Sequence, residues 1–250
     1  MNYELRQTMR DYNIELKNRI GFIQTVLAEA GAEGIVFGNS GGKDCVLVGI
    51  LCKMACANTL GLIMPCGSKS NYREDMNDAE TIAGLYKIDS KVVDLSLLKS
   101  AFTQLLEQSA APSKAALDNI PPRLRMMTLY AVAASENRLV AGTGNKSERY
   151  MGYFTKWGDG AYDFNPIADL TVTEIYEFLK FLDVPQHIID KTPSAGLYDG
   201  QTDESDMGVT YKKIDDYILN GVASEEDQAI INKYHRAGEH KRRMPLIYGG

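Results

Sequence analysis

The chain reads GIVFGNSGGKDCVLVGIL from Gly34 to Leu51. The apolar run at 34–38 predicts a buried strand, and the apolar residues that follow Asp44 predict the start of a helix. The turn between them is built of small residues, which let the backbone approach a ligand closely. Because the start of a helix also offers unpaired N–H groups and a partial positive charge, this strand–turn–helix unit predicts a phosphate-binding site.

The spacing of the glycines distinguishes this turn from two other phosphate loops. A Walker loop has four residues between its glycines and then Lys-Ser or Lys-Thr, and the dinucleotide fingerprint is G-x-G-x-x-G. Here three residues separate Gly38 from Gly42, and Lys43 is followed by Asp44. The turn resembles the Ser-Gly-Gly-x-Asp-Ser loop of the N-type ATP pyrophosphatases, with Cys45 in the place of the last serine. The alternative is an ordinary glycine-rich turn between a strand and a helix.

The composition indicates a globular chain without a large basic surface. Of the 250 residues, 44% are hydrophobic and 24% are charged, and the net charge is −6. This charge argues against a broad nucleic-acid interface, which requires a basic face. No stretch approaches the ~20 apolar residues of a membrane span, and the first residues lack the apolar core of a signal peptide. We therefore expect a cytoplasmic protein with neither nucleic acid nor membrane as a partner.

The four cysteines do not have the spacing of a metal site. Cys45, Cys52 and Cys56 lie at i, i+7 and i+11, on one stripe of the predicted helix, and Cys66 is separate. We expect them to pack against the sheet as small apolar side chains. We expect no disulfide in the cytosol.

Strand and helix signals alternate over much of the chain. Such alternation predicts an α/β fold, a doubly wound parallel sheet with helices on both faces. Asn71, Thr171 and Ser224 each precede an acidic residue by three positions, which is typical of a helix N-cap. The predicted strands cover 34–38, 60–64, 91–94 and 138–142, and the predicted helices cover 2–29, 43–57, 71–86, 97–109 and 122–136.

We expect the 250 residues to form one domain with four parts. An N-terminal helix at 2–29 precedes a core at about 30–190. Residues from about 195 to 209 are rich in glycine and acidic residues and form an expected mobile lid, since long loops are often lids or binding segments. C-terminal helices and a basic tail occupy 210–250.

Two loops are predicted to meet at one edge of the sheet. In doubly wound sheets, ligands bind beyond the carboxyl ends of the strands, where the strand order reverses. The first predicted strand ends in the turn at 39–45, and the fourth ends in GTGNKSE at 142–148. The second loop offers backbone donors, the Thr143 hydroxyl and the Glu148 carboxylate, so both loops contribute to the predicted site.

From Ser40 to the basic tail, the order of motifs resembles the ammonia-dependent NAD synthetase family. The most specific parts are Gly152-Tyr-Phe-Thr-Lys-Trp-Gly-Asp-Gly160 and Glu239-His-Lys-Arg-Arg243. The other matching motifs are SGGKD (40–44), RLRM (123–126), GTGNKSE (142–148), KTPSA (191–195), DE (203–204) and the run from GVTY to IDDY (208–217).

This resemblance implies an adenine nucleotide alpha hydrolase-like fold of the ATP pyrophosphatase type, usually assembled as a homodimer. It implies that ATP adenylates the nicotinate carboxylate of deamido-NAD, that pyrophosphate leaves, and that ammonia then displaces AMP to give NAD. Mg²⁺ is the implied cofactor. Glutamine-using relatives carry an additional amidotransferase domain, for which 250 residues leave no room, so ammonia is the expected nitrogen donor.

The resemblance also implies roles for individual residues. Asp44 and Glu148 are implied to hold Mg²⁺, which favours carboxylates together with phosphate oxygens. Asp44 and Lys156 are implied to be catalytic. The implied contacts to deamido-NAD are Arg123, Lys156, Asp163, His240 and Lys241, and the implied contacts to ATP are Gly38, Asn39, Ser40, Gly41, Gly42, Lys43, Asp44, Cys45, Thr143 and Ser194.

The chain departs from the family pattern at Val172, where relatives place a lysine that contacts ATP, and at Cys45. We expect the missing cation to weaken ATP binding unless Lys43, Lys146 or another cation compensates. Two other functions stay open: another ATP pyrophosphatase, such as a GMP-synthetase-like or tRNA-modifying enzyme, and a nucleotide-binding sensor without turnover. The net charge argues against a tRNA enzyme, and the retained carboxylates Asp44 and Glu148 argue against a sensor.

Overall fold

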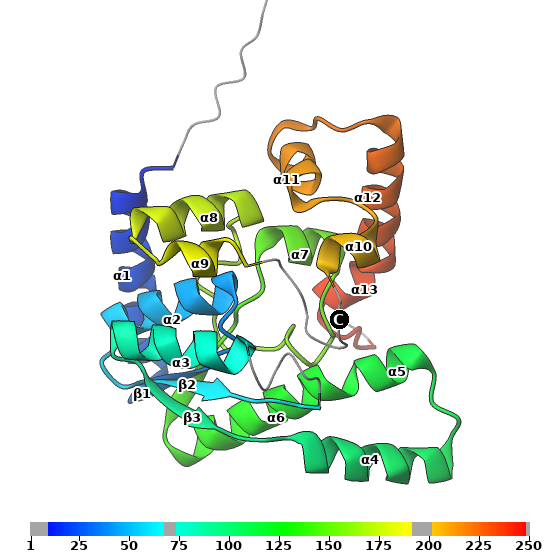
Figure 1. Ribbon diagram of the computed structural model, residues 1–250, viewed down its shortest axis with the longest axis horizontal. Helices are drawn as coiled ribbons and strands as arrows, with labels where there is room; N and C mark the ends of the chain where they lie inside the picture. The colour runs from blue at the N-terminus through cyan, green and yellow to red at the C-terminus, as the bar shows by residue number, and fades with distance from the viewer. Residues whose placement is uncertain (1–9, 68–73, 192–201, 249–250) are drawn as a thin grey trace, which may run out of the picture.

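The computed structural model describes residues 10–67, 74–191 and 202–248, and these contain a four-stranded parallel sheet (Figure 1). Its strands are β1 (Gly34–Gly38), β2 (Thr59–Ile63), β3 (Asp89–Val92) and β4 (Arg138–Ala141), in the order β3-β2-β1-β4. Val36 of β1 lies opposite Leu60 on one side and Val140 on the other. The chain therefore moves outward from β1 to β3 and returns beside β1 with β4, so that the strand order reverses between β1 and β4.

Helices cover both faces of the sheet, as the alternation of strand and helix signals predicts. Because successive strand residues point to opposite faces, Ile35 and Phe37 belong to one buried cluster and Val36 to another. The first cluster includes residues of α1 (Tyr12–Ala30), α2 (Lys43–Ala55), α3 (Glu74–Tyr86), α8 (Val172–Phe181) and α9 (Gln186–Ile189). The second includes residues of α4 (Ser96–Ser109), α5 (Lys114–Asp118) and α6 (Ile120–Ser135).

A third buried cluster holds the C-terminal part of the chain against α7 (Lys146–Met151) and α8. Met151 and Val172 meet Tyr211, Ile214 and Ile231 there. Figure 1 shows this group in orange and red at the upper right of the view. It comprises α10 (Asp203–Met207), α11 (Tyr211–Asn220), α12 (Glu225–Ala237) and the short α13 (Glu239–Arg242).

Several predicted boundaries differ from the observed ones by one or two residues, and the start of the N-terminal helix differs by more. The first helix begins at Tyr12 rather than at residue 2, because the carboxylate of Asp11 accepts the N–H groups of Asn13 and Ile14 and caps it. The third strand lies at Asp89–Val92 rather than at 91–94. The expected lid at 195–209 falls partly outside the described residues, and its described part contains the helix α10.

Two of the predicted helix caps are confirmed. Thr171 forms a reciprocal capping box with Glu174 at the start of α8, and the Ser224 hydroxyl accepts the N–H of Asp227 at the start of α12. Asn71 lies outside the described residues. The predicted packing of the cysteines against the sheet is also confirmed: Cys52 lies in the first cluster with Cys45 and Cys56 packed against it, and Cys66 lies in the second.

All four cysteines are free thiols. Among the described residues, no helix combines the length and the apolar character that crossing a membrane requires.

Candidate functional site

The turn after β1 is held in shape by Asn39, whose side chain is almost fully buried. Its amide nitrogen Nδ2 donates to the carbonyl of Ala79 at 3.2 Å, and its Oδ1 accepts the N–H of Gly41, also at 3.2 Å. Gly41 has a φ of +71°, a left-handed conformation that favours glycine. The buried amide of Asn39 therefore holds the turn through both its nitrogen and its oxygen. The left-handed backbone conformation at Gly41 favours glycine at that position.

The same turn leads directly into α2, with Gly42 as its N-cap. No side chain caps this helix start. A Cβ atom at Gly42 would lie 3.3 Å from Oγ of Ser40, which itself accepts the Gly42 N–H. Since the first N–H groups of an α-helix have no partner within the helix, the start of α2 presents donors to an anion. The turn from Gly38 to Cys45 thus has the geometry that the predicted phosphate cradle requires.

The second predicted loop lies beside the first, as expected from the strand order. The side-chain amide of Asn145 donates to Oδ1 of Asp44 at 3.1 Å, which joins the loop after β4 to the start of α2. The Thr143 hydroxyl lies against the Cys45 thiol. Burial raises the pKa of this thiol, and its contacts with Ser40 and Thr143 oppose the rise without cancelling it. Cys45 is therefore a neutral polar group in this site.

Three charged side chains share the space between the two loops. The ammonium of Lys43 donates to Oδ2 of Asp44 at 2.8 Å, and only 6% and 16% of these two side chains are exposed. Burial and the nearby charge of Asp44 raise the pKa of Glu148, an effect that Lys43 only partly offsets. Burial acts to lower the pKa of Lys43, but the charges of Asp44 and Glu148 outweigh it and the pKa is raised. One ammonium thus faces two carboxylates that repel each other.

This pair of carboxylates fits a divalent cation. A cation between Asp44 and Glu148 would relieve the repulsion that raises the pKa of Glu148. Within the described ranges, no group of three or more His, Cys, Asp or Glu side chains is arranged to hold a metal. Mg²⁺ is commonly bound by one or two carboxylates together with waters and substrate phosphates, so two carboxylates beside the predicted phosphate cradle are a suitable set.

A second group of predicted residues gathers at the other end of the loop that follows α7. The guanidinium of Arg123 donates from Nε and Nη2 to the carbonyl of Lys156, each at 3.4 Å. The ammonium of Lys156 donates to the carbonyl of His240 at 2.8 Å. Lys241 donates to the carbonyls of Gly152 and Phe154 at 2.9 and 2.8 Å. The structure therefore brings Arg123, Lys156, His240 and Lys241 together, as the resemblance implies.

Asp163 is not joined to this basic cluster by any contact among the described residues. Its Oδ2 accepts the backbone N–H of Val140 at 2.7 Å, and its Oδ1 accepts the hydroxyl of Tyr130 at 3.3 Å. Burial, together with the charge of Asp163, raises the pKa of Tyr130 to about 12. Tyr130 lies two turns from Arg123 on α6, which corresponds to about 10 Å along the helix. Asp163 thus anchors the loop to β4.

Two other residues noted in the sequence have different outcomes. Ser194 lies outside the described residues. Val172 is buried and packs with Met151 and Tyr211 in the third cluster, while its backbone N–H donates to the Ser147 hydroxyl. An apolar side chain at this position therefore has a packing role here.

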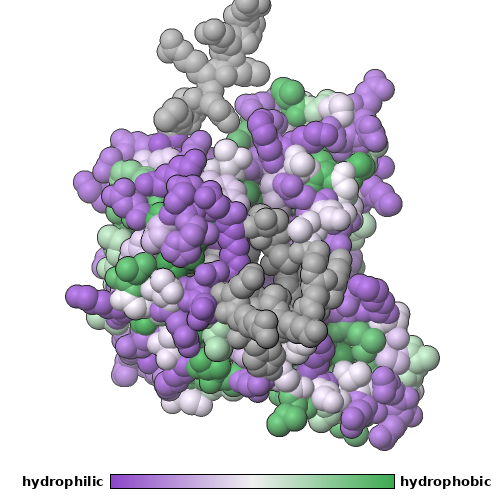
Figure 2. Space-filling model, in the orientation of Figure 1, coloured by the Kyte–Doolittle hydropathy of each residue, from purple (hydrophilic) through white to green (hydrophobic). Residues whose placement is uncertain are grey.

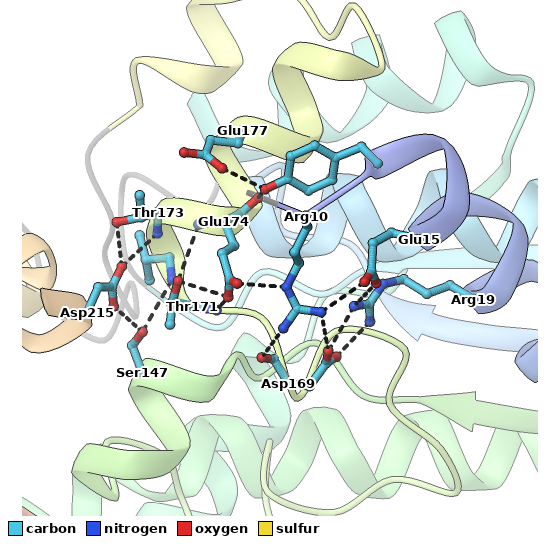
Figure 3. A network of polar contacts seen from close by, with 12 residues as sticks. Arg10, Glu15, Arg19, Ser147, Asp169, Thr171, Thr173, Glu174, Glu177 and Asp215 are labelled. Atoms are coloured by element: carbon cyan, nitrogen blue, oxygen red, sulfur yellow. Dashed lines mark hydrogen bonds and ion pairs between the residues drawn. The ribbon is translucent and has the colours of Figure 1, made fainter. Parts of the chain in front are cut away.

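Sequence reasoning missed two buried residues that organise the site, Asn145 and Asp215. Asn145 precedes Glu148 by three positions, so the capping pattern was present as a signal. Asp215 carries no local signal, because its partners Ser147 and Thr173 lie 68 and 42 positions away. Figure 3 shows Asp215 between Ser147 of α7 and the first turn of α8.

Known proteins with similar sequences and structures agree on one family. A family model described as NAD synthase matches residues 15–245. An NH3-dependent NAD⁺ synthetase of Carboxydothermus hydrogenoformans is 46% identical over 231 residues, which are 91% of this chain and 94% of that protein.

Two solved structures extend this similarity. A structure of NMN synthetase from Francisella tularensis has a TM-score of 0.90 at 37% identity and covers 96% of this chain and 100% of its own. The structure of an NH3-dependent NAD synthetase from Campylobacter jejuni, in complex with the nitrate ion, has a TM-score of 0.77 at 30% identity. The match covers 95% of this chain and 99% of that one.

Proposed function

The chain belongs to the NAD synthase family, and we propose that it amidates deamido-NAD to NAD with ammonia and ATP. The observation that supports the proposal most directly is the hydrogen bond from Asn145 to Asp44, because it joins the phosphate cradle to the loop that carries Glu148. ATP phosphates and a metal ion need these groups side by side. The enzyme is a ligase that forms a carbon–nitrogen bond.

In the first half-reaction, a carboxylate oxygen of the nicotinate attacks the α-phosphorus of ATP, and the bond to the β-phosphate breaks. We infer that the turn from Gly38 to Cys45 binds the β- and γ-phosphates, which leave together as pyrophosphate. Thr143 and Ser194 are the other proposed contacts to ATP. Asp44 and Glu148 would hold Mg²⁺, which neutralises charge on the departing pyrophosphate when it is bound.

In the second half-reaction, ammonia attacks the acyl carbon of the adenylate, AMP leaves with the bonding electron pair, and one proton is released. We propose that Arg123, Lys156, His240 and Lys241 bind the anionic groups of deamido-NAD, with Asp163 as a hydrogen-bond acceptor. Lys156 and Lys241 donate to backbone carbonyls in this structure. A phosphate or carboxylate makes a stronger, charge-assisted hydrogen bond, so both ammonium groups can exchange a carbonyl for the substrate.

Burial and the neighbouring Arg242 lower the pKa of Lys241, although Asp159 opposes this change. A bound anion would favour the charged form of Lys241 and therefore reverse the effect. A lowered pKa that a bound anion would raise is consistent with Lys241 binding an anionic ligand. Lys156 is the proposed catalytic group of the cluster, because its ammonium can orient the nicotinate carboxylate and stabilise the charge on its oxygen.

A second candidate substrate is nicotinate mononucleotide, which the same chemistry would convert to NMN. The similarity to the solved NMN synthetase favours it, since that structure superposes more closely than the Campylobacter NAD synthetase. The two substrates share the nicotinate ring, its carboxylate and one phosphate. They are distinguished by comparing kcat/KM for deamido-NAD and nicotinate mononucleotide in one preparation.

We also propose a homodimer of one-domain subunits, located in the cytoplasm. Exposed apolar side chains along α4 support an interface: Leu97, Phe102 and Leu105 are 87%, 47% and 61% exposed. Figure 2 shows hydrophobic patches over the arm formed by α4 and α5, at the lower right of the view. Light scattering after size-exclusion chromatography tests the dimer, and cell fractionation tests the location.

The first experiment is a single-turnover analysis with ATP, Mg²⁺ and deamido-NAD, with and without ammonium. We expect NAD, AMP and pyrophosphate together, with NAD formed only when ammonium is present. AMP formation with a guanine or tRNA precursor instead of deamido-NAD would point to another ATP pyrophosphatase. The absence of AMP with every acceptor, despite bound ATP, would favour a sensor.

A further inference from the structure

Asn145 is the N-cap of α7 and is completely buried. Its Oδ1 accepts the N–H of Glu148 at 2.9 Å, and its own backbone N–H donates to Oε2 of Glu148 at 2.9 Å. At its other end, Nδ2 donates to Oδ1 of Asp44 at 3.1 Å. One residue therefore touches both carboxylates that the proposed function assigns to Mg²⁺: Asn145 contacts that of Asp44 through its side-chain amide and that of Glu148 through its backbone N–H.

Helix capping alone does not explain an asparagine at this position. Ser and Asp cap helices about as well as Asn, because capping needs only an oxygen acceptor. The contact to Asp44 also needs a hydrogen-bond donor, which must lie on the same side chain as the oxygen that caps the helix. A carboxylate has no donor when ionised, and it would place a third negative charge beside Asp44 and Glu148. A serine hydroxyl is too short to span both partners from the same backbone position.

We propose that Asn145 is a positioning residue that fixes the orientation and separation of Asp44 and Glu148 for the metal ion. This inference rests on the proposed function of the two carboxylates. Asp44 is held on both of its oxygens, by Asn145 at Oδ1 and by Lys43 at Oδ2. Because Lys43 lies next to Asp44 on α2, only Asn145 ties the carboxylate to the element that carries Glu148, among the hydrogen bonds of the described residues.

If Asn145 has this role, the affinity for the metal ion depends on its side-chain amide. Residues that orient metal ligands typically contribute roughly 10–100-fold to metal affinity. We therefore expect Asn145→Ser to keep the cap of α7 and to weaken metal binding by about tenfold or more. We expect Asn145→Ala to lose both the cap and the bridge, so that its melting temperature falls as well.

The test measures binding of Mn²⁺ by electron paramagnetic resonance, in the presence of saturating α,β-methylene-ATP, which cannot be cleaved between its α- and β-phosphates. Melting temperature is measured on the same samples. Thr171→Ala is the matched control, since Thr171 caps α8 with the same pair of hydrogen bonds but contacts neither Asp44 nor Glu148. We expect this control to lower the melting temperature and to leave Mn²⁺ affinity unchanged.

Asp44→Asn, in the same assay, separates the two proposals. Loss of Mn²⁺ affinity in Asp44→Asn together with unchanged affinity in Asn145→Ser overturns the role of Asn145 and leaves the metal site intact. Unchanged affinity in Asp44→Asn overturns the proposed metal site itself. Equal losses in Asn145→Ser and Thr171→Ala would also overturn the positioning role, because they would follow from destabilisation alone.

Discussion

Asp215 connects three helices through a buried carboxylate, and its removal should destabilise the whole C-terminal part of the chain. It is 1% exposed. It accepts hydrogen bonds from the Ser147 hydroxyl at one oxygen and from both the N–H and the hydroxyl of Thr173 at the other, the latter two at 2.7 Å (Figure 3). These contacts join α11 to the first turns of α7 and α8.

The size of the effect follows from the groups that lose their partner in Asp215→Ala. The Ser147 hydroxyl is fully buried, whereas Thr173 is half-buried and water can satisfy part of its loss. A buried polar group without a partner costs about 1–3 kcal/mol. Counting Ser147 in full and the two Thr173 donors in part, we expect a loss of about 3–5 kcal/mol in the free energy of unfolding. Asp215→Asn keeps one acceptor and should lose about half as much.

Urea unfolding followed by circular dichroism measures this loss, with the slope of the transition as a check that the unfolded state is unchanged. Asp216→Asn is the matched control on the same helix, because Asp216 is only half-buried and, among the contacts of the described residues, pairs only with the exposed Lys212 one turn away. Such exposed pairs contribute about 0.3–0.5 kcal/mol. The reasoning is refuted if Asp215→Ala loses no more stability than Asp216→Asn.

Four further predictions concern charges in and around the site. Asp44→Asn should abolish pyrophosphate release from a folded protein, measured by a coupled phosphate assay, and release at the normal rate would contradict its role. Lys156→Ala should raise KM for deamido-NAD while calorimetry finds ATP affinity unchanged, and the reverse pattern would move Lys156 to the ATP half of the site. Lys43→Met removes the ammonium that faces the two carboxylates, so Mg²⁺ should raise its melting temperature more than that of the wild type, and an equal response would count against this reasoning. Burial acts to raise the pKa of Asp169, but the hydrogen bond and charge of Arg19 outweigh it, so the pKa is lowered. The free energy of unfolding should therefore fall as the pH drops below about 4. In acid denaturation curves, Asp169→Asn should make this fall less steep.

The parts of the fold that the sequence predicted well are those set by local pattern. The strand at 34–38 was predicted with its observed bounds, because an apolar run between glycines has one clear interpretation. The meeting of the two loops followed from topology, since β4 pairs with β1 in a parallel sheet. The cap at Thr171 followed from the pattern of a hydroxyl and a glutamate three positions later.

The parts that could not be predicted depend on partners far away in the chain. Arg10 donates to Glu174, 164 positions later, and nothing in the sequence near Arg10 indicates that partner (Figure 3). The start of α1 depended on whether Asp11 would cap the helix, and an aspartate inside a helical pattern does not decide this by itself. The resemblance implied that Asp163 contacts deamido-NAD, but no local pattern indicated its hydrogen bond with the N–H of Val140, 23 positions away.

The buried ammonium of Lys43 bears on the expectation that Val172 leaves the ATP site without a cation. Val172 fills an apolar cluster with Tyr211, and Tyr176 packs against the same cluster from one turn further along α8. The ammonium of Lys43 lies 5.5 Å from the ring of Tyr211 and 6.0 Å from that of Tyr176. Aromatic faces at this distance attract a cation. The positive charge in this region therefore comes from α2, and a valine on α8 is compatible with a cation beside the proposed phosphate cradle.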